Sequence, residues 1–360
     1  MNKRTFKPNW AVAPGSIIDE HREAANMTQA DLAERMGYSF KHVNRVIGGH
    51  DAVTPEFALK LESVFDMPAH VWLNIEAKYQ EHLARKKEDQ QIEGELHCLK
   101  TIPHRAMVKL DYVEDAKGVD MVRALRSFFS VASLSLLPDV WREVNANYRK
   151  SKSFESHQYA LLAWLTQGLR LAANEDIAPF DKAGLKASLI SIKKLSCLEG
   201  VSFEKPLKEK LAQHGVVLIF VPAPPGAHVS GATRWIRKDA ALIQLSLRHK
   251  SDDQLWFTLF HELGHILLHS KKTQFIDFDK RDVRCDLETE ADEFAANTLI
   301  DQSALSTFVN EGGFTADSIR SFARTQNVSP GIVVGRLQHL GHVPFGSQLN
   351  KLKQRFEFAN

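Results

Sequence analysis

The sequence predicts a multidomain, mainly helical protein with an all-α N-terminal part and a C-terminal part of the α+β class. Three observations lead to this fold class. The chain has 360 residues, which suits two or three domains of roughly 150 residues each. Its first ninety residues repeat short helical patterns, each with a start and a stop signal. Beyond Gly215 the apolar pattern becomes that of buried strands followed by a strongly apolar helix.

Five short helices are predicted in the first ninety residues. Thr28 has the position of an N-cap, Asp31 that of the capping-box acid, and Gly37 suits the left-handed turn that ends a helix. Leu32, Ala33 and Met36 form a buried stripe at helical spacing between these signals. The expected helices are Ile17–Asn26, one after Thr28, one from Ser39 to Ile47, one after Thr54-Pro55 and one after Pro68.

The middle of the chain contains no motif with recognisable chemistry. Residues 83–95 are charged and read as a helical tail that runs into a linker. Residues 96–205 look mostly helical, with apolar stripes at Met121–Phe129 and Tyr159–Leu171. We therefore divide the chain into an N-terminal domain (1–90), a helical middle region (91–205) and a C-terminal domain (206–360).

The C-terminal region begins with strands and continues with helices. Val216–Val221 reads as a buried strand, and Ala241–Leu247 reads as a second strand that could pair with an extended substrate at a sheet edge. A strongly apolar helix begins near Asp252. Residues 314–338 have the outline of a helical hairpin with a turn at 327–329, which is more often a packing element than a DNA reader.

His261-Glu262-Leu263-Gly264-His265 carries the chemistry of this region. Two histidines four residues apart share one helix face, so both imidazoles can reach one metal ion, and Glu262 can contact a metal-bound water. In a chain of this length and histidine content, about 0.04 matches to His-Glu-x-x-His are expected by chance. His269 continues the same face, but it lies about 12 Å along the axis from His261 and is better read as a cation at the helix end.

The third metal ligand is expected from a second buried helix downstream. Glu288 and Asp292 share a face at a spacing of four residues. One carboxylate can bind the metal while the other accepts the second ring N–H of a ligand histidine. The spacing alone leaves open which of the two binds the metal, and we expect Glu290 and Glu293 to be solvated. Zn²⁺ is the expected cofactor.

His261, His265, Glu288 and Asp292 together resemble the zinc site of the thermolysin-like metallopeptidases, the zincins. Residues 257–265 (Phe-Thr-Leu-Phe-His-Glu-Leu-Gly-His) and 290–296 (Glu-Ala-Asp-Glu-Phe-Ala-Ala) resemble the ImmA/IrrE family of regulatory metallopeptidases. This resemblance implies a thermolysin-like α+β domain. Many members of the family have Leu-Met-Pro after the second helix, whereas this chain has Leu299-Ile300-Asp301, a difference that lies beyond the ligands.

Residues 14–80 resemble the HigA-like helix-turn-helix regulators of XRE type. The resemblance rests on Pro14-Gly15, residues 28–33 (Thr-Gln-Ala-Asp-Leu-Ala), residues 53–56 (Val-Thr-Pro-Glu) and residues 72–74 (Trp-Leu-Asn). Together the two resemblances cover about half of the chain, and their fusion is a known arrangement. They imply bacterial or phage origin, cytoplasmic action and gene regulation.

A helix-turn-helix places its second helix in the major groove of DNA. Here that helix would present Ser39, Lys41, His42, Asn44 and Arg45, of which asparagine suits adenine and arginine suits guanine. Phe40 could contact a thymine methyl group or pack in the core. Residues 1–90 contain 12 basic and 13 acidic side chains, so this domain should bind non-specific DNA weakly. A homodimer on a palindromic operator would compensate, and a protein-interaction module of the same fold is the alternative.

Composition and charge agree with a cytoplasmic protein. The 46 basic and 44 acidic residues leave a net charge of +2, so no field of one sign covers the chain. No apolar run approaches the roughly 18 residues of a membrane span, and the start lacks the apolar core of a secretory signal. Cys98, Cys197 and Cys285 are odd in number and far apart, which favours free thiols in a reducing compartment.

The sequence thus predicts a DNA-binding transcriptional regulator with a zinc metalloendopeptidase domain that cleaves a specific partner protein, such as a repressor. His261, His265 and Glu288 would bind zinc, and Asp292 would orient a ligand histidine. Glu262 would act as the general base. His228, Arg234 and His249 are candidates for a second oxyanion donor. The alternative is a HigA-like antitoxin or autorepressor whose peptidase-like domain binds a partner, such as a toxin, or senses zinc or stress without proteolysis.

Overall fold

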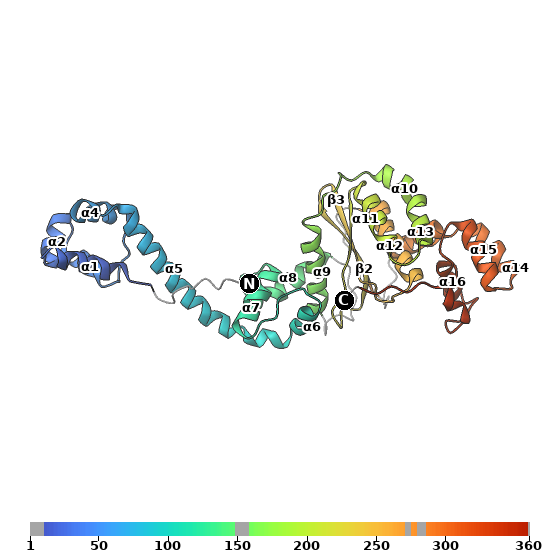
Figure 1. Cartoon of the computed structure of the whole chain (residues 1–360), viewed down its shortest axis with the longest axis horizontal. Helices are drawn as coiled ribbons and strands as arrows, with labels where there is room; N and C mark the ends of the chain where they lie inside the picture. The colour runs from blue at the N-terminus through green and yellow to red at the C-terminus, as the bar shows by residue number, and fades with distance from the viewer. Residues whose placement is uncertain (1–10, 148–157, 271–274, 279–285, 359–360) are drawn as a thin grey trace. The chain divides into compact units, whose positions relative to one another are not determined.

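The computed structural model in Figure 1 describes residues 11–147, 158–270, 275–278 and 286–358. Contacts divide the chain into two compact units, Met1–Gly94 and Glu95–Asn360. The finer division into 1–90, 91–205 and 206–360 stays a prediction. Cys98 and Cys197 are free cysteines, as expected, and Cys285 lies outside the described residues. Among the helices that the structure describes, none combines the length and apolarity needed to cross a bilayer.

The N-terminal unit is built of helices, as predicted. They are α1 Pro14–Ala24, α2 Gln29–Met36, α3 Phe40–Ile47, α4 Pro55–Phe65 and α5 Ala69–Gly94. α1 begins three residues earlier than expected, because the fixed φ of Pro14 suits the first turn of a helix. α5 continues as a helix through the charged segment up to Gly94, which confirms the predicted helical tail.

The capping signals of this unit act as the sequence predicts. The Thr28 side chain accepts a hydrogen bond from the Asp31 amide while the Asp31 carboxylate accepts one from the Thr28 amide, so the capping box is complete. Gly37 has a φ of +66°, and it turns the chain between α2 and α3. Ser39 and Thr54 cap α3 and α4. The helices pack around a buried core that contains Ile18, Leu32, Met36, Val43, Val46, Phe57, Leu61 and Trp72.

The second unit begins with helices that cover residues 96–212. Its α-helices are α6 His104–Lys109, α7 Val119–Phe129, α8 Leu137–Asn147, α9 Gln158–Ala172, α10 Lys182–Lys194 and α11 Glu204–Ala212. Short 3₁₀ turns connect them at Leu96–Lys100, Leu134–Leu136 and Leu195–Cys197. α7 and α9 coincide with the two predicted apolar stripes, so both predictions are confirmed.

A four-stranded sheet follows, in the order β1-β3-β2-β4. Its strands are β1 Val216–Phe220, β2 Val229–Arg237, β3 Ala240–Leu245 and β4 Phe275–Phe278. β1 and β3 are parallel, whereas β2 is antiparallel to both β3 and β4. The two predicted strands are confirmed as β1 and β3. The suggestion that the segment 241–247 offers a free sheet edge is wrong, because β3 lies between β1 and β2.

Helices cover both faces of this sheet. On one face, Gln244 of β3 donates to the Trp164 carbonyl of α9, and the Trp164 ring N–H donates to the Val221 carbonyl. On the other face, Ile243 and Leu245 belong to the core that contains Leu259 and Leu263 of α12. Burial on both faces explains why β1 is a continuous apolar run and why β3 is apolar except for Gln244.

The remaining helices complete the core around α12. They are α12 Asp252–Leu268, α13 Asp286–Leu299, α14 Gln302–Glu311, α15 Ala316–Gln326 and α16 Pro330–His339, followed by a 3₁₀ turn at Gln348–Leu352. α15 and α16 form the predicted hairpin, with Asn327 in the left-handed conformation. Ile319 and Val333 from this hairpin are fully buried in the core, so it is a packing element. The C-terminal domain is therefore a mixed α+β fold.

Candidate metal centre and DNA-recognition helix

α3 carries the side chains that were predicted to contact DNA. Ser39, Lys41, Asn44 and Arg45 are exposed, while His42 is half-buried and its ring packs against Tyr38 and Phe57. Val43 and Val46 face the core. Phe40 is 56% exposed, so it lies on the presented face and is not a core residue.

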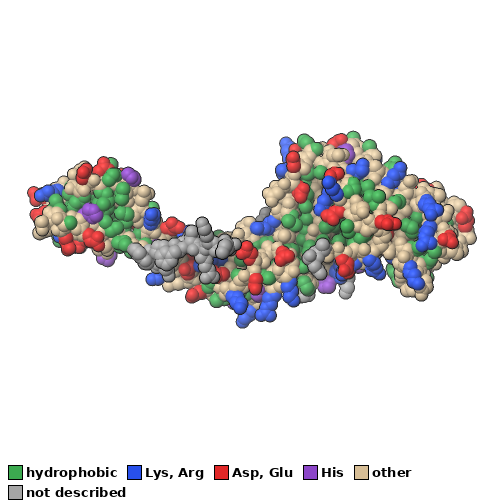
Figure 2. Space-filling view, in the orientation of Figure 1, with side chains coloured by type: hydrophobic (Ala, Val, Ile, Leu, Met, Phe, Trp, Pro, Cys, Tyr) green, Lys and Arg blue, Asp and Glu red, His purple; other side chains and the backbone are tan. Residues whose placement is uncertain are grey.

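Two of these side chains are held by neighbours in the same domain. The Arg45 guanidinium donates two hydrogen bonds to the Asp51 carboxylate, with Nε–Oδ2 and Nη2–Oδ1 distances of 2.7 and 2.6 Å. Asn44 donates to the side chain of Gln29 on α2 at 3.0 Å. Asp51 thus places a negative charge beside the recognition helix. Acidic and basic side chains are also mixed over this domain on the face shown in Figure 2, in keeping with its nearly balanced charge.

α12 is a helix that is buried almost all round, which a helix at the centre of a domain requires. Its first turn contains Asp252 and Asp253, which favour a helix N-terminus, and Leu255, Leu259 and Leu263 pack in the core. Near the middle of α12, His261 and His265 are on one face, and their side chains are only 1% exposed. Buried imidazoles need polar partners.

Glu288 of α13 faces these two histidines, as the sequence predicts for a third ligand. Its Oε2 atom lies 3.2 Å from His261 Nε2 and 3.6 Å from His265 Nε2. The two Nε2 atoms are 2.9 Å apart. In a tetrahedral zinc site with bonds of 2.0–2.1 Å, ligand atoms are separated by about 3.3 Å. The three donor atoms therefore have the spacing of one metal site, and they form the one such group found among the described residues.

The other ring nitrogens of both histidines also have partners. His261 Nδ1 lies 2.9 Å from Asp292 Oδ1, which is the contact that was predicted for Asp292. His265 Nδ1 lies 2.9 Å from Nδ1 of His269, whose Nε2 lies 3.1 Å from Glu290 Oε2. Glu290 is exposed, as expected for a solvated side chain, but α13 runs alongside α12 and also brings its carboxylate to His269, a contact that the sequence did not predict.

The sequence interpretation missed this role of His269. It excluded His269 as a ligand, correctly, on the ground of distance along the helix. The i, i+4 spacing between His265 and His269 was the available signal, because residues four apart can hydrogen-bond to each other as well as share a metal.

The local environment sets the protonation states that a metal ion needs. Burial lowers the pKa of His265 to about 4. Burial alone would raise the pKa of Glu288, but hydrogen bonds from His261 and His265 outweigh it and lower that pKa well below its usual range. At neutral pH His265 is therefore neutral and Glu288 is ionised, and both forms can donate electron pairs to a cation.

Glu262 is fully buried and faces β2. A Cβ atom built on Gly231 of β2 would lie 2.5 Å from Glu262 Oε1 and 2.7 Å from Thr258 Cγ2. Only a residue without a side chain leaves room for the carboxylate here. Thr233, two residues further along the same strand face, donates from Oγ1 to the Glu262 carbonyl at 3.4 Å.

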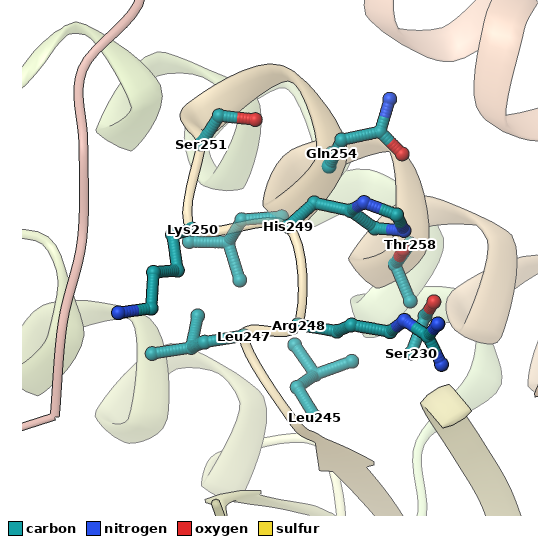
Figure 3. A pocket seen from close by; sticks show the side chains of 10 residues that line it. Ser230, Leu245, Leu247, Arg248, His249, Lys250, Ser251, Gln254 and Thr258 are labelled. Carbon is teal, nitrogen blue, oxygen red and sulfur yellow. The ribbon is translucent and has the colours of Figure 1, made fainter. Parts of the chain in front are cut away.

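The three suggested oxyanion donors have different positions. Side chains alternate across a strand, so Arg234 lies on the face of β2 opposite to Gly231 and Thr233, and this suggestion is wrong. His249 lines a pocket that also contains Thr258 (Figure 3). His228 directly precedes β2, and its role stays a prediction.

These features define a class of protein. A helix-turn-helix domain is followed by an α+β domain in which a buried helix carries a His-Glu-x-x-His motif, and a carboxylate from a second helix is the third potential metal ligand. The family comparisons agree with this class. Residues 18–72 match the helix-turn-helix family model, and residues 211–338 match the model of the IrrE N-terminal-like domain, a peptidase family. The chain belongs to the helix-turn-helix transcriptional regulators and carries a metallopeptidase-family domain at its C-terminus.

Relatives were found for the N-terminal domain. Over 63 residues the chain is 33% identical to the uncharacterized HTH-type transcriptional regulator YddM of Escherichia coli (strain K12), covering 18% of this chain and 67% of that protein. Among solved structures, an addiction module antidote protein of a HigA family from Coxiella burnetii is 28% identical, with 23% of this chain and 92% of that chain covered and a TM-score of 0.22. The antitoxin HigA with the higBA promoter from Pseudomonas aeruginosa is also 28% identical, with 24% of this chain and 95% of that chain covered and a TM-score of 0.23.

Proposed function

We propose that this protein is a transcriptional regulator whose C-terminal domain is a zinc-dependent endopeptidase of thermolysin-like type that cleaves a specific regulatory protein. One observation carries the proposal: two histidine nitrogens and one carboxylate oxygen from α12 and α13 converge at the spacing of a single metal site. The donor set of two histidines and one glutamate is that of catalytic zinc sites, in which the fourth position belongs to water.

His261, His265 and Glu288 are the residues that would hold the ion. A bound zinc ion would lower the pKa of its water and polarise a peptide carbonyl. Asp292 would accept the Nδ1–H of His261, and His269 that of His265, so that both Nε2 atoms present their lone pairs to the site. His269 would in turn donate to Glu290.

Glu262 is the proposed general base. It lies one residue from a ligand on the same helix and is wedged against Gly231, so its carboxylate is held in one position. It would accept the proton of the attacking water and pass it to the leaving amine of the peptide.

The helix-turn-helix domain would bring the peptidase to an operator in the cytoplasm. Exposed side chains at the N-cap and along α3 are the proposed contacts, namely Ser39, Lys41, Asn44 and Arg45, with His42 at the margin of the same face. Because Asp51 pairs with Arg45 and the domain has no net positive charge, binding would depend on base contacts and on a homodimer at a palindromic site.

The decisive experiment compares wild type with Glu262→Gln and His265→Ala. The full-length proteins are loaded with zinc and mixed with the products of neighbouring genes, and defined cuts are read by mass spectrometry. We expect zinc in wild type and Glu262→Gln but not in His265→Ala, and cleavage by wild type alone. Cleavage by Glu262→Gln at the wild-type rate would refute the assignment.

A second function is favoured if wild type binds zinc and operator but cuts nothing. The protein would then be an antitoxin-like repressor whose peptidase-like domain binds a toxin or another partner, or a sensor of zinc or stress. Operator affinity that depends on Arg45 and Asn44 but not on Glu262 would support the repressor. A difference in operator affinity between the zinc-free and zinc-loaded protein would support the sensor.

A further inference from the structure

The loop after the recognition helix carries an acidic side chain that lies beside the helix. α3 ends at Ile47, and Asp51 follows in the loop that leads to α4. Asp51 forms an ion pair with Arg45 of α3, in which the Arg45 side chain is 49% exposed and that of Asp51 is 29% exposed. An exposed ion pair adds little to the stability of a fold, so the main consequence of this pair is for what Arg45 can bind.

The backbone of the loop fixes the position of Asp51. The amides of His50 and Asp51 both donate to the Arg45 carbonyl, with N–O distances of 2.8 and 3.3 Å. Gly49 makes this return of the chain possible, because its φ of +71° lies in the left-handed region that side-chain-bearing residues rarely adopt. Two residues after Asp51, Val53 is buried in the core of the domain. The loop is therefore held at both ends.

Asp51 occupies one edge of the Arg45 guanidinium and leaves another edge available. A guanidinium has five N–H groups in a fixed plane. Nε and Nη2 each donate one hydrogen to the Asp51 carboxylate, at 2.7 and 2.6 Å. The remaining N–H groups are the two on Nη1 and the second one on Nη2, and no acceptor for them lies in the part of the chain that the structure describes. The outer edge formed by Nη1 and Nη2 thus still presents two parallel N–H bonds.

The ion pair also changes the charge that α3 presents. The hydrogen bonds from Arg45 hold the pKa of Asp51 below its ordinary range, so the carboxylate is ionised at neutral pH and the pair has no net charge. A phosphate gains little from a neutral pair, because phosphate affinity depends on net positive charge. A hydrogen bond to the edge of a base has no such requirement. Guanine presents two acceptors in the major groove, O6 and N7, which match two parallel N–H bonds.

We propose that Asp51 is a positioning residue for DNA recognition, which holds the outer edge of Arg45 toward O6 and N7 of one guanine in the operator. The orientation is set before DNA binds, so the long arginine side chain loses little conformational freedom in the complex. The same carboxylate would disfavour a contact between Arg45 and a phosphate. The inference rests on the proposed operator binding by α3 and names a base that this helix reads.

The test uses the full-length protein and an operator found by selection from a library of random DNA duplexes. Each base pair of the selected site is then changed in turn, and affinities are measured by fluorescence anisotropy. Arg45→Ala identifies the base pair that Arg45 reads, because this variant loses discrimination only there. We expect a G·C pair at that position, which wild type prefers over A·T by about 5- to 150-fold.

Asp51→Ala should reduce this preference for G·C by about 2- to 12-fold, because Arg45 must then be fixed at the moment of binding. Glu20→Ala is the matched control. It removes one exposed carboxylate from α1 of the same domain and should keep the full preference. In an Arg45→Ala background, Asp51→Ala should change the preference no further, whereas a general disturbance of the fold would act with or without Arg45.

Three results would overturn the inference while leaving DNA binding by α3 intact. The first is an undiminished preference for G·C in Asp51→Ala. The second is an equal loss of affinity at every base pair in Arg45→Ala, which would place Arg45 on a phosphate. The third is a base pair other than G·C at the position that Arg45 reads. If wild type enriches no sequence from the library, the proposed operator binding itself fails, and the inference fails with it.

Discussion

Gly231→Ala tests whether the Glu262 carboxylate is held in a precise position by the sheet. The added methyl group would lie 2.5 Å from Glu262 Oε1, whereas ordinary contacts begin at 3.4 Å. Glu262 is fully buried, so the carboxylate or the strand must move by close to 1 Å. A displacement of this size costs about 100-fold in catalysis, and overpacking costs about 1–3 kcal/mol of stability.

The assay is cleavage of the partner protein, with zinc content and thermal unfolding measured on the same samples. We expect cleavage to fall by about two orders of magnitude while zinc content is kept, because the added methyl group would meet Glu262 and Thr258 first. Gly168→Ala is the matched control. Its methyl group would lie 1.8 Å from Gln244 Oε1 on the other face of the sheet, so it should lower stability without slowing cleavage. Wild-type cleavage by Gly231→Ala, or an equal loss in both variants, would refute the reasoning.

Three further predictions concern other parts of the chain. Asp292→Ala removes the acceptor of His261 Nδ1 and should weaken zinc affinity about 10- to 100-fold in a chelator competition, whereas unchanged affinity would exclude the orienting role. Asp51→Ala removes a negative charge and releases Arg45. The affinity for non-specific duplex DNA, measured by fluorescence anisotropy at 50 mM salt, should therefore rise about tenfold. A decrease in this affinity would contradict the prediction. Burial raises the pKa of Asp252 from its usual value near 4 to about 6, so the folded state binds this proton more tightly. Stability therefore falls as pH rises from about 4 to about 6, by up to about 3 kcal/mol, and is constant in this respect above that range. Asp252→Asn should remove that fall in urea titrations at pH 4 and pH 7, and an identical pH dependence in both proteins would count against it.

Local signals predicted the helices of the N-terminal domain well. N-caps, the capping box and the Gly37 turn depend on hydrogen bonds and φ angles within three or four residues. They can therefore be recognised without knowing what the helix packs against. The same reasoning identified α12 and α13 and the face on which His261, His265, Glu288 and Asp292 lie, because i, i+4 spacing is a property of the helix itself.

Pairing between strands could not be predicted in this way. β2 contains serine, glycine, threonine and two arginines, so it lacks the apolar run or strict alternation that marks a strand. β2 is a strand because β3 and β4 pair with it on either side. The neighbouring β3 was recognised as a strand, but its apolar sequence did not reveal that both its edges are occupied.

The sequence by itself determined the elements whose information is local: the capped helices, the two apolar strands and the helix faces that carry potential ligands. Only the tertiary structure decided which faces meet. The packing of α13 on α12 brings Glu288 to the two histidines and Glu290 to His269. The order of the strands puts Gly231 against Glu262 and Arg234 on the opposite face. These contacts join residues that are tens of positions apart in the chain. Their geometry depends on how whole helices and strands pack to remove apolar surface from water. No short stretch of sequence specifies that packing.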